Sequence, residues 1–164
     1  MKSTGCVLAV VAAMLVGCGD DNPIGSELGP VHDSIGPEMD RLGVQRALWE
    51  AQGLEDYTYD VQRVCFCSPF RQGVRVTVVD GAVTGATDLA SGEVLEPNEV
   101  QWYLTIDALF DLVQAAYDRN AHEVQLEFDA SRGYPTRIFI DYSEMVMDEE
   151  LGFTLLGEVR ALGD

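Results

Sequence analysis

Cysteine, acidic and aromatic side chains are the groups in this chain that could carry chemistry. Cys18 follows Leu15-Val16-Gly17 at the end of an apolar run, which is the pattern of a cysteine that receives a lipid. Cys65 and Cys67 are one residue apart and could form a disulfide or exchange thiols. Weaker candidates are carboxylates that could offer oxygen ligands to calcium and two loop aromatics that could contact a partner, namely Asp141, Glu144, Asp148, Glu149, Glu150, Trp102 and Tyr103.

The N-terminal residues have the order of parts of a bacterial secretory signal. Lys2 supplies a positive start, and residues 7–16 are apolar without interruption. A retained transmembrane helix is disfavoured, because spanning a bilayer takes about 20 apolar residues. A plain secretory signal with a coincidental cysteine is the remaining alternative. We expect residues 1–17 to be removed and Cys18 to anchor the chain by lipid to the inner or the outer membrane of a bacterial envelope.

The charge of the chain excludes some partners. Asp and Glu number 28 against 10 Lys and Arg, which gives a formal charge of -18. Such a surface repels nucleic acid and anionic lipid headgroups alike. We therefore expect no nucleic-acid partner, and we expect the lipid rather than the protein surface to hold the membrane. Solubility is the simplest reason for the acidity, and a cationic partner is the alternative.

Composition divides the expected mature chain into a tether and one domain. Residues 18–36 are rich in Gly, Asp, Pro and Ser and show no periodicity, which is typical of a flexible linker. His32 lies in this linker and is expected to be solvated. Residues 37–164 have the length of a single domain, which we expect to be monomeric.

Hydrophobic periodicity predicts two helices and about six strands. A helix is expected over residues 37–52, and a second helix begins after Thr105, whose side chain can cap it. Asp80-Gly81 predicts a hairpin turn in which Val78 faces Val83 and Val76 faces Gly85. The predicted strands cover residues 57–67, 74–79, 82–87, 123–129, 136–142 and 153–159, with a loop over 88–104.

These elements predict an α+β fold. Two helices pack on an antiparallel sheet of about six strands, in the order helix, three strands, helix, three strands. Val124, Leu126 and Phe128 alternate with polar residues, so one face of the sheet is expected to be wet. Arg63 is the exception on a mostly apolar face and is expected to need a carboxylate or carbonyl partner. The repeated order suggests two similar halves, although no residues match between them.

A combination of short motifs resembles a family. They are Gly53-Leu54-Glu55-Asp56-Tyr57-Thr58-Tyr59, Arg63, Cys65-Phe66-Cys67, Leu109-Phe110, Gly133-Tyr134-Pro135, Ile140-Asp141 and Asp148-Glu149-Glu150-Leu151-Gly152. Together they resemble an uncharacterised bacterial lipoprotein family, domain of unknown function 6174, over about residues 49–159. The resemblance implies an envelope lipoprotein with an α+β domain, and it implies no activity.

Three functions compete, and the expected one is a non-enzymatic binding or interaction module. It would use Trp102 and Tyr103 to contact an envelope protein or a ligand, unless both rings cover the core. Thiol or disulfide function is the second, but Cys65 and Cys67 in a strand are about 6.5 Å apart at Cα, so a bridge needs a bend. A weak calcium site is the third, and no other cofactor is expected. Hydrolysis is not expected, because His122 lacks a nucleophile in any recognisable motif.

Overall fold

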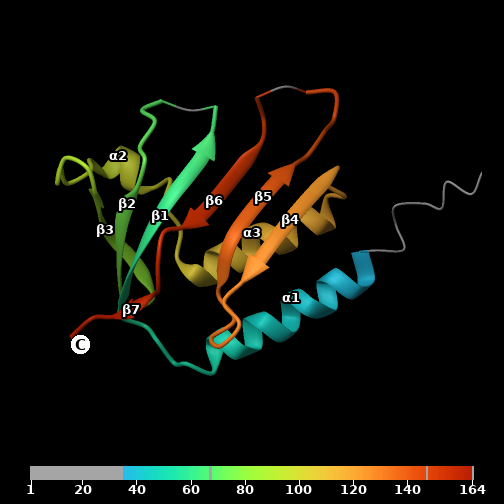
Figure 1. Cartoon of the computed structure of the whole chain (residues 1–164), viewed down its shortest axis with the longest axis horizontal. Helices are drawn as coiled ribbons and strands as arrows, with labels where there is room; N and C mark the ends of the chain where they lie inside the picture. Colours follow the sequence, from blue (N-terminus) through green and yellow to red (C-terminus); the bar gives the residue numbers. More distant parts are fainter. Residues whose placement is uncertain (1–34, 67, 147, 164) are drawn as a thin grey trace, which may run out of the picture. The chain divides into compact units, whose positions relative to one another are not determined.

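The computed structural model describes residues 35–66, 68–146 and 148–163 and forms one antiparallel sheet with helices on one face (Figure 1). Its elements in chain order are α1 (Ile35–Glu50), β1 (Tyr57–Cys65), β2 (Val74–Val79), β3 (Ala82–Asp88), α2 (Pro97–Val100), α3 (Ile106–Asp118), β4 (Glu123–Phe128), β5 (Pro135–Asp141), β6 (Leu151–Leu155) and β7 (Arg160–Ala161). The α+β class and the antiparallel sheet are as predicted. The predicted signal, Cys18 and most of the predicted tether lie outside the described residues.

The seven strands are ordered β3-β2-β1-β6-β5-β4, and β7 pairs with β1. The chain therefore closes the middle of its sheet by pairing an early strand with a late one, with Val61 opposite Leu155. Each half of the chain contributes three neighbouring strands to this order, β3-β2-β1 from the first half and β6-β5-β4 from the second. The similarity of the two halves stays a prediction.

The core lies between the sheet and the helices. Tyr57, Tyr59 and Val61 alternate along β1 and are fully buried, as the period of two predicts. The buried stripe of α3 packs over β5 and β4, and Thr105 caps this helix by accepting a hydrogen bond from the backbone N–H of Ala108 at 3.1 Å. The predicted cap and apolar stripe of this helix are therefore confirmed.

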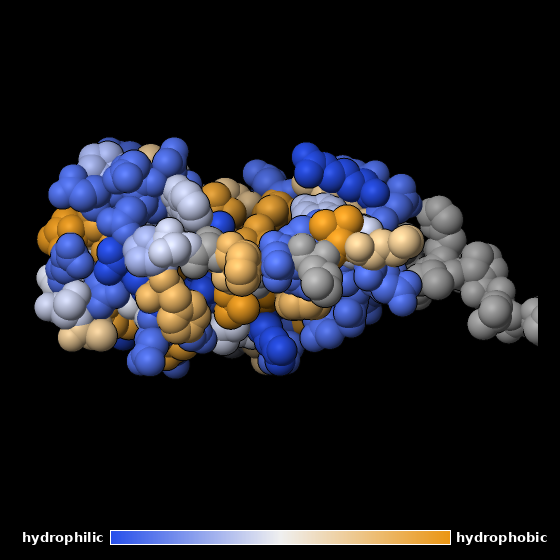
Figure 2. All heavy atoms as spheres, turned by 90° about the horizontal axis from the view of Figure 1, so that it is seen from above, coloured by the Kyte–Doolittle hydropathy of each residue, from blue (hydrophilic) through white to orange (hydrophobic). Residues whose placement is uncertain are grey.

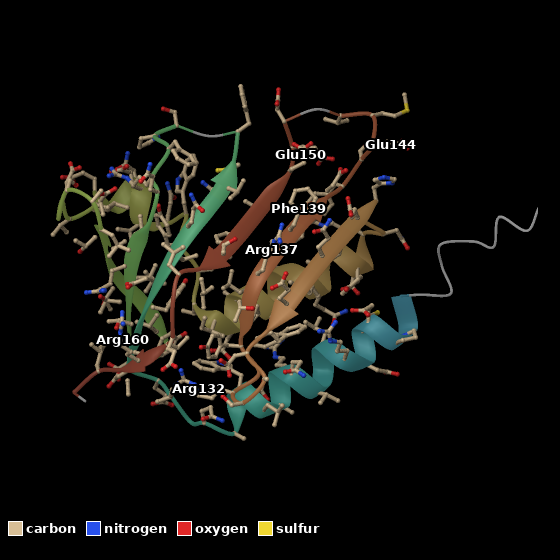
Figure 3. The ribbon with its side chains drawn as sticks, viewed as in Figure 1. Arg132, Arg137, Phe139, Glu144, Glu150 and Arg160 are labelled. Atoms are coloured by element: carbon tan, nitrogen blue, oxygen red, sulfur yellow. The ribbon has the colours of Figure 1, made fainter. Side chains whose placement is uncertain are left out.

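The opposite face of the sheet is polar. Asp60 on β1 accepts two hydrogen bonds from Arg75, at 2.7 and 2.9 Å, and a third from Arg160 at 3.0 Å. These arginines lower the pKa of Asp60, although burial opposes them. Figure 3 shows Arg137 and Phe139 along β5 on the face turned away from α3. The prediction of one wet face is confirmed.

Several details differ from the predicted elements, among them the end of β1, which is Cys65 rather than residue 67. The first helix begins and ends two residues early, and the segment 88–104 contains the short helix α2. Thr84 is an extra residue in β3, so Val78 faces Val83 as predicted but Val76 faces Ala86 rather than Gly85.

The strand predicted over residues 153–159 is instead two short strands. β6 pairs with the second half of β1, and β7 pairs with its start at Thr58 and Tyr57. Gly157 lies in the exposed bend between them. The alternation of apolar and polar residues does not reveal this break, because β6 and β7 both pair with β1.

Candidate functional site

The candidate site is built around Arg63, which β1 carries on its helix-covered face. The guanidinium carbon of Arg63 lies 4.6 Å from the centroid of the Trp102 ring. At this distance the ring face attracts the cation. Burial lowers the pKa of Arg63. The sequence predicted a carboxylate or carbonyl partner for Arg63. The structure places an aromatic ring beside it, which the sequence did not indicate.

Trp102 and Tyr103 leave the end of α2 side by side but differ in burial. Trp102 is 40% exposed, whereas Tyr103 is half-buried and packs against the core. Backbone hydrogen bonds from Trp102 to Glu99 and from Tyr103 to Val100 fix this turn, at 3.1 and 3.0 Å. The alternative in which the rings cover the core therefore describes Tyr103 better than Trp102.

Arg71 ties three segments together beside this turn. Its guanidinium donates to Glu99 at 2.8 Å and to Asp88 at 3.1 Å, and it lies 3.5 Å from Glu93. The side chain of Arg71 is only 14% exposed. Hydrogen bonds to Glu99 and Asp88 raise the pKa of Arg71. Sequence reasoning missed this cluster, because its carboxylates are 17 to 28 residues away along the chain.

Asp88 at the end of β3 is the most constrained carboxylate of the cluster. One of its oxygens accepts hydrogen bonds from the backbone N–H groups of Ala90 and Ser91, at 2.9 and 2.8 Å, and the other accepts from Arg71. The Ser91 backbone and Arg71 are the main causes that lower the pKa of Asp88 to about 2. These hydrogen bonds hold Arg71, Asp88 and Glu99 in fixed positions, and we call these three side chains the wall of the site.

These side chains enclose a pocket of about 220 Å³ between α2 and the connection from β1 to β2. The residues that line it are Arg63, Ser68, Pro69, Arg71, Asn98, Glu99, Trp102 and Tyr103. Aromatic faces, a guanidinium and an amide together suit a small flat ligand that carries an anionic group. The pocket is large enough for a single aromatic ring with a carboxylate.

Of the predicted thiol pair, the structure describes Cys65 alone. Cys65 ends β1 and is half-buried, and with Phe66, Ser68 and Phe70 it lines a shallow hollow of about 360 Å³. Cys67 lies outside the described residues. A bridge between Cys65 and Cys67 therefore stays a prediction.

The acidic residues suggested as calcium ligands are spread along the connection from β5 to β6. Asp141 accepts a hydrogen bond from the backbone N–H of Ser143 at 2.8 Å, and Figure 3 shows Glu144 and Glu150 at opposite ends of the connection. Among the residues that the structure describes, no group of three or more His, Cys, Asp or Glu side chains could hold a metal ion. Asp148 and Glu149 accordingly join no ligand cluster.

Two other polar residues lie away from the pocket. His122, which the sequence analysis considered for hydrolysis, is exposed and directly precedes β4. Arg137 on β5 lies close to the acidic connection in sequence, but its guanidinium is 3.7 Å from Glu127 on the neighbouring strand. The absence of enzymatic activity stays a prediction.

The fold and the pocket together define an α+β domain with one helix-covered antiparallel sheet and a small aromatic, arginine-lined site. The chain belongs to a family described as Family of unknown function (DUF6174), whose model matches residues 41–157. This match runs from α1 to just beyond β6 and confirms the domain of unknown function that the short motifs resembled, whereas the lipoprotein character stays a prediction. No curated protein and no solved structure matches the chain. No helix in the described part of the chain is both long and apolar enough to cross a membrane.

Proposed function

We propose that this protein is a non-enzymatic binding module of the bacterial cell envelope, anchored by lipid at Cys18. Its binding site is the pocket that Arg63 and Trp102 help to line, and its ligand is a small flat molecule with a carboxylate. The single observation that carries the proposal is the contact of the Arg63 guanidinium with the Trp102 ring on the pocket wall, at 4.6 Å.

The charges of the pocket favour an anionic ligand in an otherwise acidic protein. Glu99 and Asp88 hydrogen-bond to Arg71, whose single positive charge offsets part of their two negative charges, and of these two carboxylates only Glu99 lines the pocket. Arg63 adds a second positive charge on the pocket surface. A carboxylate entering here gains a charge-assisted hydrogen bond to a guanidinium, and the partly exposed indole offers its ligand a flat apolar surface.

The envelope location is supported by the sequence. Residues 7–16 form an apolar run, and Leu15-Val16-Gly17 precedes Cys18. A binding module needs no catalytic group, and a lipid followed by a flexible tether would leave the domain free to meet a ligand near the membrane. Thiol function and calcium binding gain no comparable support from the described residues.

The two tryptophans of the chain allow a direct test. Their indole N–H groups give two cross-peaks in a ¹H–¹⁵N spectrum, and Trp49 is buried at 2% exposure in the core. Addition of benzoate should shift the Trp102 peak and leave the Trp49 peak in place. Benzylammonium, which has the same ring and the opposite charge, should shift neither.

Two matched arginine variants test whether benzoate binds at the pocket or is attracted by positive charge elsewhere on the protein. Arg63→Gln should abolish the shift of the Trp102 peak, whereas Arg137→Gln on the open sheet face should retain it. If millimolar benzoate moves neither peak, or if both ring probes act equally, the carboxylate site is wrong. A benzoate shift that survives Arg63→Gln would also contradict the assignment.

A further inference from the structure

A second surface, built from residues outside the pocket proposal, lies at one end of the sheet. Phe66, Phe70, Met145 and Val146, here called the apolar tip, are 81%, 63%, 93% and 53% exposed. Phe66 and Phe70 belong to the β1–β2 connection, whereas Met145 and Val146 belong to the β5–β6 connection.

Strand pairing brings these two connections to the same end. Cys65 at the end of β1 faces Leu151 at the start of β6, so the chain leaves one strand where it enters the other. Figure 1 shows both connections above the sheet, and Figure 2 looks onto this end and shows orange and tan side chains across it, bordered by blue ones. The shallow hollow lined by Phe66 and Phe70 belongs to the same surface.

The apolar tip has no role in the core of the domain. Large apolar side chains that gather at the surface of a soluble domain usually mark a site of interaction. Phenylalanine and methionine also suit a partner helix, since aromatic rings supply contact area and methionine adapts its shape. The exposure of Phe66 and Met145 is therefore better explained by a partner than by folding.

Charge indicates what kind of partner fits. Glu144 and Asp148 are exposed within the same connection as Met145, and Glu150 follows them. Arg71, close to Phe70 in sequence, is bound to carboxylates. A second copy of this chain, with its formal charge of -18, or an anionic bilayer would be repelled.

We propose that the apolar tip docks a protein segment with apolar side chains flanked by Lys or Arg, such as a basic amphipathic helix. Its apolar face would cover Phe66, Phe70 and Met145, and its basic residues would face Glu144 and Asp148. This is the helix-in-groove mode of recognition, with electrostatic complementarity at the rim. The proposal does not depend on the ligand pocket, because it uses different side chains.

The test uses the purified full chain and a fluorescent synthetic helix with leucine on one face and lysine on the other. We expect fluorescence anisotropy to show that this peptide binds at least about tenfold more tightly than the same peptide with glutamate in place of lysine. The double variant Phe66→Ser, Met145→Ser should weaken binding of the lysine peptide by about tenfold or more. Val44→Ser on α1, where the side chain is 60% exposed, is the matched control and should change nothing.

Several results would overturn the proposal. If the lysine peptide bound the double variant as tightly as the wild type, the binding would come from the overall negative charge of the chain and not from the apolar tip. Binding of phosphatidylcholine vesicles that is lost in the double variant, without peptide binding, would assign the surface to lipid. Self-association lost in the same variant would assign it to a second copy. Circular dichroism of the double variant, whose substituted side chains are exposed, checks that it folds.

Discussion

Arg71 donates a hydrogen bond from Nη1 to Oδ2 of Asp88 at 3.1 Å, joining the β1–β2 connection to the end of β3. Both side chains are largely buried, at 14% and 10% exposure. A buried charge is tolerated only when it is paired and hydrogen-bonded, and Asp88 satisfies this condition with Arg71 and two backbone N–H groups. The pair therefore holds the wall on which the candidate pocket depends.

Asp88→Asn should lower the thermal midpoint at pH 7 by about 5 °C or more, because an amide N–H₂ would face the guanidinium of Arg71. The pKa of Asp88 is lowered from 3.8 to about 2 in the folded protein. Its contribution to stability is thus present above about pH 4 and is lost as the pH falls toward about 2. The difference between wild type and variant should close over that window.

Thermal melts at several acidic pH values test the role of Asp88. Asp40→Asn on the exposed side of α1 is the matched control and should leave the midpoint nearly unchanged. A constant difference between wild type and Asp88→Asn down to about pH 2 would contradict the assigned pKa.

Gly133→Ala should destabilise the domain strongly. Gly133 has φ +79°, and a Cβ there would lie 2.3 Å from the backbone oxygen of Gln45 and 2.8 Å from Cβ of Leu48. The strained backbone costs about 1 kcal/mol and the forced movement of α1 about 1–3 kcal/mol more. Denaturant unfolding should therefore show a loss of about 2–4 kcal/mol.

Gly81→Ala is the control for this substitution. Gly81 has φ +70°, yet nothing lies within 4 Å of an added Cβ. Its replacement should cost only the backbone strain of about 1 kcal/mol. Equal losses for both variants would mean that α1 does not press against the β4–β5 turn.

Tyr57→Phe should remove a buried hydrogen bond that joins the sheet to α3. The backbone N–H of Ile106 donates to Tyr57 Oη at 2.9 Å, and Tyr57 is fully buried. Leaving this N–H without an acceptor should cost about 1–3 kcal/mol at neutral pH. Burial also raises the pKa of Tyr57 to about 12.

The raised pKa gives Tyr57 an alkaline signature. Because the folded protein keeps the phenol neutral, the stability of the wild type falls as the pH rises from about 10 to about 12. Tyr57→Phe has no phenol at this position and lacks this loss. Denaturant unfolding should therefore show that the free energies of unfolding of wild type and variant become more similar between about pH 10 and about pH 12. The half-buried Tyr142, replaced by Phe, should behave like the wild type, and an unchanged difference for Tyr57→Phe would refute the explanation.

Intact mass spectrometry of protein from its membrane fraction tests the envelope proposal. We expect residues 1–17 to be absent, Cys18 to carry the mass of a lipid, and reduction to add two hydrogens as a Cys65–Cys67 bridge opens. Cys18→Ala should remove the lipid mass and, because cleavage depends on the lipidated cysteine, should leave residues 1–17 on the chain. A lipid-free wild type would refute anchoring, and a mass unchanged by reductant would refute the bridge while leaving anchoring intact.

Local features of this fold could be predicted from sequence, whereas distant contacts could not. The Thr105 cap, the Asp80-Gly81 turn and the alternation along β1 depend on neighbouring residues, and all three are confirmed. The position of β6 beside β1 and the break before β7 depend on pairing across the chain. No short-range pattern reports such pairing.

The candidate site also has parts that could be predicted from sequence and parts that could not. Trp102 and Arg63 stood out in the sequence as an aromatic in a loop and a cation on an apolar face. Their contact, and the capture of Arg71 by Asp88 and Glu99, arise only when β1, β3 and α2 meet. Sequence reasoning therefore found the two principal side chains but not the pocket that they share.

The central position of β1 has a consequence for biogenesis. Its neighbours on one side, β6 and β7, come from residues 151–161, so the middle of the sheet stays open until almost the whole chain is available. Such long-range pairing slows folding. For the export proposed above, this means that a chain crossing a membrane N-terminus first cannot complete its sheet until residues 151–161 have also crossed.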